Sequence, residues 1–114
     1  MMKNKEDFRF ITGRGNYVDD VRLPGTLYAS FVRSPYAHAA IKGIDTSEAL
    51  KVPGVKLILT GPDLAKNLPP LFPTQGGPGM KKYTRCALSI GKVRCVGEPV
   101  AAVIADDRYI AEDG

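Results

Sequence analysis

The run VAAVIA at residues 100–105 decides the fold class of this 114-residue chain. All six of its residues are apolar, and most of them are small or β-branched. A short continuous apolar run of this kind is typical of a strand that is buried on both faces of a sheet. We therefore expect residues 100–105 to form a buried strand, and residues 108–113 to begin a helix after it.

Three other segments predict strands. The segment TLYASFVR at residues 26–33 is rich in aromatic and β-branched residues and is closed by a Ser-Pro pair. In the segment HAAIKGI at residues 38–44, the two isoleucines cannot both face one side of a regular strand, so Gly43 is expected to mark a bulge. The run VKLILT at residues 55–60 has the apolar, β-rich character of a central strand.

The segments between these strands predict only short helices. Asp45 is followed three residues later by Glu48, which is the capping-box pattern that satisfies the free N–H groups at a helix start. A Pro-Gly pair soon ends that helix. A turn at residues 61–63 leads into a single helical turn at residues 64–67.

Irregular structure is expected in two longer segments. Residues 4–24 form a turn-rich lead-in, and residues 68–79 hold four prolines and three glycines, which forbid regular structure in that loop. Order is expected to resume at residues 86–88 and 93–96. Because the strands come in pairs with only short helices between them, the sequence predicts a single α+β domain over residues 1–114.

The overall composition disfavours several classes of function. The chain is 44% hydrophobic and 25% charged, and its net charge of +4 comes from Lys and Arg residues that are spread along the sequence. Nucleic-acid binding normally needs a clustered basic face, so this class is disfavoured. No apolar run approaches the ~18 residues of a membrane helix. We expect a soluble, cytoplasmic protein without membrane or nucleic-acid partners, whose cysteines are reduced thiols.

Several short patterns resemble functional motifs, but each has a simpler structural interpretation. The GRG triplet at residues 13–15 lacks the spacing and the preceding strand of a dinucleotide-binding loop. The Gly-rich stretch at residues 76–81 lacks the Lys-Ser or Lys-Thr pair of a phosphate loop, and its proline removes a backbone donor. The pair Asp19-Asp20 is more typical of a turn than of a cation site.

The only histidine and the two cysteines are the remaining candidates for chemistry. His38 lies between two alanines at a strand start, which favours a structural hydrogen-bonding role over acid–base catalysis. Cys86 and Cys95 would lie opposite one another if residues 90–91 formed a hairpin turn. The arginines beside them could make a thiol reactive, whereas two small, half-buried side chains are the simpler interpretation. One histidine and two cysteines do not suggest a zinc site.

Seven blocks of sequence, taken in order, resemble one known family. The blocks are FRFITGRGNYVDD at 8–20, VRSPYAHA at 32–39, IDTSEA at 44–49, PGV at 53–55, GPDL at 61–64, VRCVGEPVA at 93–101 and AD at 105–106. They are similar to the start of the molybdenum-binding large subunit of carbon monoxide dehydrogenases, aldehyde oxidases and xanthine dehydrogenases. The detailed match is closest to the carbon monoxide dehydrogenase large chain.

The resemblance implies the α/β hammerhead fold, which agrees with the α+β class. It also implies that a molybdopterin-type molybdenum cofactor and a catalytic glutamate lie in domains that follow this one, with iron-sulfur and FAD groups in partner domains or subunits. No catalytic, cofactor-binding or metal-binding residue is carried onto this chain. The family's corresponding loop approaches the substrate funnel, which gives residues 68–85 a gating or lining role. Relatives continue beyond Gly114, so we expect a domain that is truncated at its C-terminus.

Three hypotheses from different classes follow. The leading one is a non-catalytic structural domain of a molybdenum-dependent oxidoreductase. Its partners are the remaining molybdenum-binding domains and the iron-sulfur and flavin subunits, and the isolated domain associates with itself. The second is a stand-alone binding module for an acidic partner or a small ligand. The third is a small enzyme that uses Cys86 or Cys95, which a thiol-reactivity assay at neutral pH would test.

Overall fold

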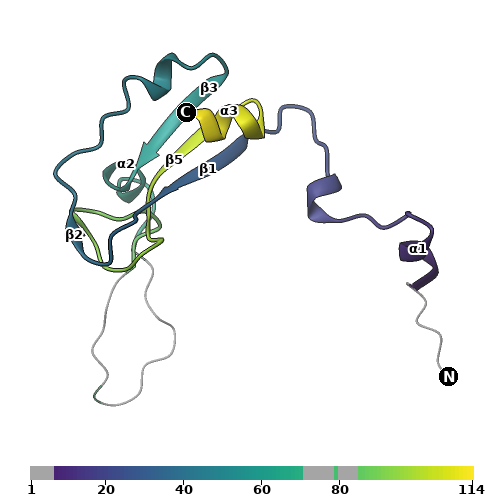
Figure 1. Ribbon diagram of the computed structural model, residues 1–114, viewed down its shortest axis with the longest axis horizontal. Helices are drawn as coiled ribbons and strands as arrows, with labels where there is room; N and C mark the ends of the chain where they lie inside the picture. Colours follow the sequence, from purple (N-terminus) through teal and green to yellow (C-terminus); the bar gives the residue numbers. More distant parts are fainter. Residues whose placement is uncertain (1–6, 71–78, 80–84) are drawn as a thin grey trace.

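The computed structural model describes residues 7–70, 79 and 85–114, and Figure 1 shows the arrangement of their elements. These elements are, in chain order, α1 (Asp7–Ile11), η1 (Val18–Asp20), β1 (Tyr28–Arg33), β2 (Ala39–Ala40), η2 (Ala49–Lys51), β3 (Val55–Thr60), α2 (Gly61–Ala65), β4 (Lys92–Val93), β5 (Pro99–Ala105) and α3 (Arg108–Asp113). Strands with only short helices between them confirm the predicted α+β class. Most of the predicted loop at residues 68–85 lies outside the described residues.

Strand β5 is the centre of the fold. It pairs antiparallel with β1 on one side and with β3 on the other, which gives a three-stranded sheet in the order β1-β5-β3. Four of its residues are buried, namely Ala101, Ala102, Val103 and Ala105. The prediction of a buried strand is therefore confirmed. The prediction of a central strand at residues 55–60 is wrong, because β3 lies at an edge of the sheet.

Helix α3 covers one face of this sheet, as Figure 1 shows. Asp107 begins the helix, because its carboxylate accepts a hydrogen bond of 2.8 Å from the backbone N–H of Tyr109. The helix ends at Gly114, whose backbone lies against Val103 of β5 and Val55 of β3. The predicted helix at residues 108–113 is confirmed, and it supplies the second layer that the sheet needs for a core.

The second predicted strand, residues 38–44, is mostly absent. Only β2 is a strand, and it pairs with β4, Ala39 opposite Val93 and Ala40 opposite Lys92. One further backbone hydrogen bond joins Ile41 to Gly91, and Gly43 lies beyond this ladder, so it marks no bulge. The reason is that a strand needs a hydrogen-bonded neighbour, and the short β4 provides one for two residues only.

Of the two short helices predicted between the strands, one is absent and the other is present with different bounds. At residues 45–50 the carboxylate of Asp45 accepts hydrogen bonds from the backbone and hydroxyl of Ser47, so this segment forms a turn and only η2 follows it. The prediction of a capped helix there is wrong. Helix α2 is present but begins at Gly61, earlier than predicted. Its start is closed by Asp63, which accepts a hydrogen bond from the backbone of Thr60.

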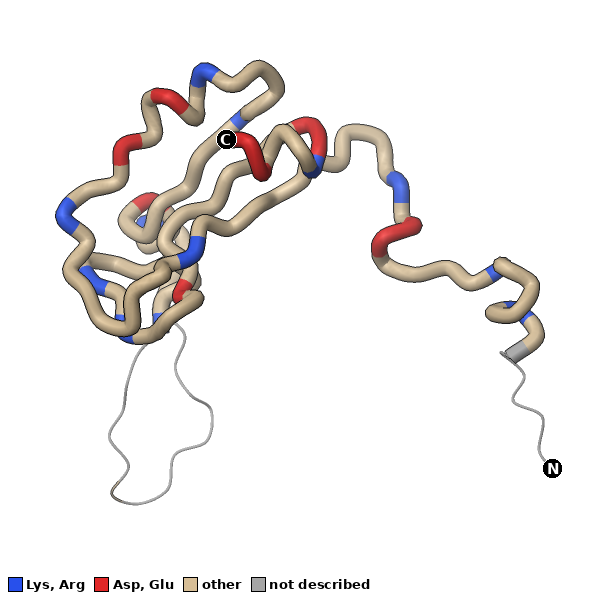
Figure 2. The backbone as a smooth tube through the Cα atoms, in the orientation of Figure 1, with Lys and Arg blue, Asp and Glu red and all other residues tan. Residues whose placement is uncertain are grey.

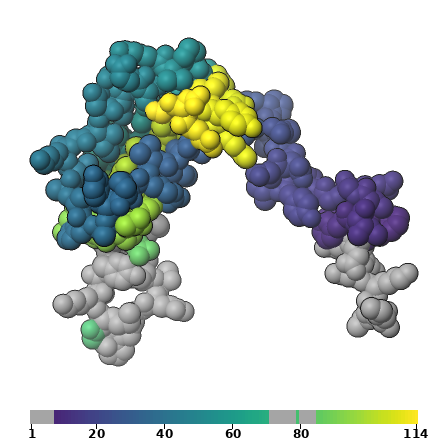
Figure 3. All heavy atoms as spheres, in the orientation of Figure 1, coloured from purple at the N-terminus to yellow at the C-terminus, as the bar shows by residue number. Residues whose placement is uncertain are grey.

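The predicted lead-in contains α1 and η1 and stands away from the rest of the molecule (Figures 1 and 3). Gly25, in the left-handed conformation at φ 79°, lies in the turn that leads from this segment into β1. Within the described residues, no helix is long and apolar enough to cross a membrane.

Candidate functional site

The end of β1 and the start of β5 meet in a turn-rich corner, which we define as residues 33–36 and 94–99. The backbone N–H of Gly97 donates to the carbonyl oxygen of Ser34 at 2.8 Å, and the N–H of Ser34 donates to the carbonyl oxygen of Glu98 at 3.0 Å. The Arg33 guanidinium adds a third bond, 2.9 Å, to the Gly97 carbonyl oxygen. The corner therefore joins two of the seven sequence blocks through their backbones.

Local sequence explains why each half of the corner turns. Gly97 has a φ of 82°, a conformation that costs a residue with a Cβ but not a glycine. On the other side, the buried Ser34 accepts a hydrogen bond of 3.0 Å from the backbone N–H of Tyr36 on its hydroxyl oxygen. Such a bond from a nearby backbone N–H to a serine hydroxyl takes the place of a bond to a neighbouring strand and favours a turn.

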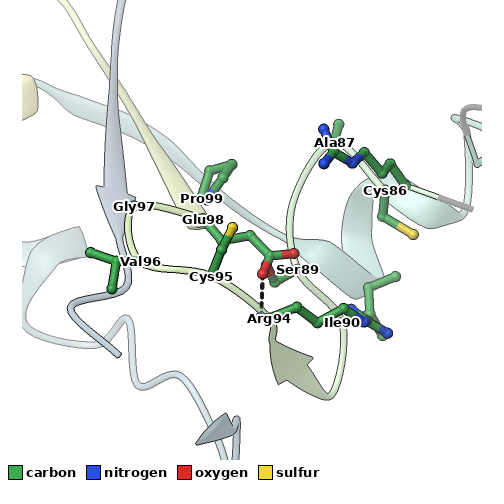
Figure 4. A pocket seen from close by; sticks show the side chains of 11 residues that line it. Cys86, Ala87, Ser89, Ile90, Arg94, Cys95, Val96, Gly97, Glu98 and Pro99 are labelled. Atoms are coloured by element: carbon green, nitrogen blue, oxygen red, sulfur yellow. Dashed lines mark hydrogen bonds between the residues drawn. The ribbon is translucent and has the colours of Figure 1, made fainter. Parts of the chain in front are cut away.

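Glu98 closes the turn at residues 94–98 with its side chain. One carboxylate oxygen accepts a hydrogen bond from the backbone N–H of Arg94, drawn as the dashed line in Figure 4. This bond lowers the pKa of Glu98, because it stabilises the ionised carboxylate, and the partial burial of the group opposes the shift. The carboxylate is therefore ionised at neutral pH and acts as a brace for the turn.

A broad, open pocket lies beside this corner (Figure 4), with a volume of about 860 Å³. Its polar lining comes from Ser89, Arg94, Cys95 and Glu98 together with Arg85 and Cys86. The hydroxyl of Ser89 is buried beside the Glu98 carboxylate, without a hydrogen bond of normal geometry to any described residue. The pocket thus combines cationic, anionic and thiol groups without assembling them around one point.

Cys86 and Cys95 both line this pocket, but they do not face each other across a hairpin. They are free and exposed, and strand β4, which lies between them in the sequence, pairs with β2. The condition for that arrangement, a hairpin turn at residues 90–91, is not met, because the backbone partner of Gly91 is Ile41, from a distant part of the chain. The expectation of two small, half-buried side chains is wrong as well, since both residues are exposed.

The other candidates from the sequence remain apart from the corner. His38 is exposed and its side chain forms no hydrogen bond within the described residues, so the expected structural bond is not seen. Asp20 accepts a bond of 2.9 Å from the backbone N–H of Tyr17, which confirms the prediction of a turn. Asp19 lies 3.4 Å from Arg108. The Gly-rich stretch at residues 76–81 is almost wholly outside the described residues.

Sequence reasoning did not find the corner as a site. Ser34, Gly97 and Glu98 each belong to a block that carries the family resemblance, but nothing in either block indicates its partner. The available signal was the combination of a Gly-Glu-Pro triplet before a buried strand, which is typical of a tight turn entering a sheet. Which segment receives that turn is fixed by the sheet topology alone.

Comparison with known proteins gives one consistent family. The sequence model described as "Aldehyde oxidase and xanthine dehydrogenase, a/b hammerhead domain" matches residues 12–114. The carbon monoxide dehydrogenase large chain of Afipia carboxidovorans is 48% identical over 111 residues, which are 97% of this chain and 13% of that protein. This chain therefore spans about an eighth of the length of that relative.

Solved structures support the same family assignment. The quinoline 2-oxidoreductase of Pseudomonas putida superposes on 96% of this chain with a TM-score of 0.91 at 42% identity, and the match covers 14% of that chain. A Cu,Mo-containing carbon monoxide dehydrogenase superposes on 98% with a TM-score of 0.84 at 47% identity, again over 14% of its own chain. The fold described above is thus similar to one part of much larger oxidoreductases.

Proposed function

Because this chain belongs to the aldehyde oxidase and xanthine dehydrogenase family, as its a/b hammerhead domain, we propose that it is a non-catalytic structural domain of a larger oxidoreductase. The parent enzyme in this proposal is molybdenum-dependent and resembles the carbon monoxide dehydrogenase large chain. Its reaction is the hydroxylation or oxidation of carbon monoxide, an aldehyde or a heterocycle.

The bonding of the corner is the observation that carries this proposal. Its polar groups are directed at backbone atoms of the chain itself: Glu98 binds the N–H of Arg94, and Arg33 binds the carbonyl oxygen of Gly97. A catalytic group must reach the reacting atoms of a substrate. Groups that bind backbone in this way hold a turn, so the shared residues here support an architectural role.

The described residues do not fit a resident metal centre. Within residues 7–70, 79 and 85–114, no three His, Cys, Asp or Glu side chains lie close enough together to hold a metal ion. In keeping with the family resemblance, the proposal assigns the molybdenum cofactor to parts of the parent enzyme that this chain does not match. Iron-sulfur and FAD groups belong to partner domains or subunits in the same proposal, and the location is cytoplasmic.

A hybrid protein tests this role. The matched segment of the Afipia carboxidovorans large chain is replaced by this chain, and the hybrid is produced with the partners of that enzyme in a host that makes the cofactor. We expect the hybrid to assemble, to contain molybdenum and to oxidise carbon monoxide. The matched control is a hybrid with Gly97→Val, which is strained at φ 82° and should weaken assembly.

Two results would contradict the proposal. One is a hybrid that folds but neither binds molybdenum nor turns over, since a scaffold of this family should support both. The other is turnover, or stoichiometric molybdenum, in the isolated 114-residue chain assayed with an artificial electron acceptor, because the proposal places the chemistry elsewhere.

The pocket beside the corner favours one alternative, a stand-alone binding module for an acidic partner or small ligand. Arg94 and Arg85 on its lining would attract an anion. Calorimetric titration of the isolated chain with small carboxylates and inorganic phosphate tests this function, with Arg94→Gln as the control variant. Saturable binding that the substitution removes would support the alternative.

A further inference from the structure

An arm at the N-terminal side, residues 7–24, has few contacts with the sheet. Figure 3 shows it standing off the rest of the molecule. Two side-chain links hold its inner part: Asp19 to Arg108 at 3.4 Å, and Arg22 to the Tyr28 hydroxyl at 3.0 Å. Both links are exposed, and exposed polar links of this kind contribute little stability.

The arm nevertheless has a defined shape. The rings of Phe10 and Tyr17 stack with centroids 5.9 Å apart, so the arm folds back on itself. Gly15 allows this, because a Cβ there would lie only 3.0 Å from the Tyr17 ring and 3.1 Å from the Phe10 ring. Thr12 follows the last residue of α1, and its hydroxyl donates a hydrogen bond of 2.7 Å to the carbonyl oxygen of Phe8. Because residues 7–24 fold back on themselves and have a defined shape, we call this segment the hook.

The large apolar side chains of this hook face solvent. Ile11 is 81% exposed, Val18 is 89% exposed and Leu23 is 66% exposed. Covering such residues removes apolar surface from water, which favours their burial against another apolar surface. The hook is therefore shaped for burial against something outside the described residues.

The match to a solved relative includes this segment. The superposition on the quinoline 2-oxidoreductase includes 96% of this chain, which leaves out about five residues, fewer than the eighteen of the arm. The arm is thus part of a fit whose TM-score is 0.91, and it follows a similar path in a protein of which this match is only 14%. The body of this domain holds the arm by only two exposed side-chain links, so a surface outside the domain would account for the retained path, and the remainder of that longer chain is continuous with the matched part.

We infer that residues 7–24 are a docking hook that seats its apolar side chains on the rest of the parent large subunit. This inference rests on the proposed function and adds the surface by which the domain is attached. The receiving surface is an apolar groove, because Ile11, Val18 and Leu23, like Phe8, expose most of their apolar side chains to water. Figure 2 shows that the hook carries both basic and acidic residues, among them Arg14 and Asp20, so its apolar side chains and not its net charge define the partner surface.

Limited proteolysis of the hybrid large chain tests the hook. Trypsin cleaves after exposed arginines, and Arg14 lies within the hook. We expect cleavage after Arg14 to be at least about tenfold slower in the hybrid than in the isolated chain, because bound segments open rarely. The triple variant Ile11→Ser, Val18→Ser, Leu23→Ser should restore rapid cleavage. The matched control, Ile11→Leu, Val18→Ile, Leu23→Ile, keeps the apolar surface and should keep the protection.

A photo-crosslinking residue at position 18 identifies the receiving surface. The inference predicts crosslinked peptides from the large chain outside the replaced segment. Crosslinks confined to this domain, to a second copy of it or to another subunit would overturn the inference, as would equal cleavage of the hybrid and the isolated chain. Activity measured on the same samples separates the two proposals: an active hybrid with a freely cleaved hook contradicts the hook alone, whereas a folded but inactive hybrid contradicts the proposed function.

Discussion

The backbone N–H of Gly97 donates a hydrogen bond of 2.8 Å to the carbonyl oxygen of Ser34, although most of the chain lies between the two residues. This bond joins the end of β1 to the turn that enters β5. At the same point the register of β1 against β5 shifts between Val32 and Arg33. The corner therefore lies where the β1–β5 ladder ends, and its bonds connect the end of β1 to the turn that precedes β5.

The brace formed by Glu98 predicts a pH-dependent loss of stability. Glu98→Ala removes the carboxylate that accepts the Arg94 N–H, and we expect it to lower the free energy of unfolding by about 1 kcal/mol at pH 7. Since the folded pKa of Glu98 is lowered, its stabilisation is present above the ordinary pKa of a glutamate and is lost as the pH falls through the lowered value. Urea unfolding at pH 7 and at pH 3 measures this difference.

The matched control for this prediction is Glu112→Ala. Glu112 is an exposed carboxylate on α3, and it accepts no hydrogen bond within the described residues. Its substitution should change stability little at either pH. If Glu98→Ala and Glu112→Ala have the same effect at pH 7, or if the effect of Glu98→Ala persists unchanged in acid, the brace described here has no energetic role.

A second prediction concerns Gly61, the first residue of α2. A Cβ at this position would overlap the carbonyl oxygen of Ser89 and would lie 2.8 Å from the Ile90 side chain. Gly61→Ala should therefore destabilise the protein by about 1 to 3 kcal/mol, the usual cost of overpacking. Gly43→Ala is the control, because a Cβ there meets nothing within 4 Å. Thermal unfolding of both variants measures the difference, and equal melting temperatures would show that the Ser89 segment is free to move.

Local patterns in the sequence were sufficient to predict some elements and not others. The buried run at residues 100–105 and the helix after it were predicted correctly, because burial and helix start are encoded within a few residues. The strand expected at residues 38–44 is mostly absent, and the hairpin considered at residues 90–91 does not form, because these two segments pair with each other over a short stretch, as β2 and β4. The sequence of one segment alone does not determine with which distant segment it pairs.

The lack of tertiary information in local sequence also explains why the corner and the turn at Asp45 were not predicted. Ser34 and Gly97 each look like turn residues in the sequence, and only the sheet order brings them together. At Asp45 two local patterns competed, since the carboxylate could cap a helix or bind Ser47, and it binds Ser47 at 3.0 Å through the backbone N–H. Choosing between such alternatives requires the tertiary structure, because their local energies are similar.

The thiols of Cys86 and Cys95 give a third prediction. Both residues are free and exposed in the structure. Two thiol equivalents should therefore react with a water-soluble disulfide reagent in the folded protein without denaturant, under mildly reducing preparation. The control is Cys86→Ser, which should leave one equivalent. Fewer than two equivalents in the folded chain, with two after unfolding, would place at least one thiol in a protected setting.

The final prediction is that the isolated chain associates with itself through the sheet face opposite α3. In the register of the sheet, Leu57 and Ile104 lie in one row on that face, and Phe31 lies in the next. Phe31 is 50% exposed and Leu57 is 48% exposed, so the face is apolar and partly open. Strand β5 is paired on both sides, so among the described residues the open edges of this sheet belong to β1 and β3.

Phe31→Lys with Leu57→Lys should shift this association to higher concentration, because two charges would have to lose water in the interface. Both side chains are about half exposed, so the domain should remain folded. The matched control adds two lysines at exposed positions outside the three strands, Ala37→Lys with Asn67→Lys, which changes the net charge equally. Sedimentation velocity over a range of concentrations distinguishes the variants. A strict monomer in the unsubstituted chain at high concentration, or an equal shift in both double variants, would show that this face does not drive association.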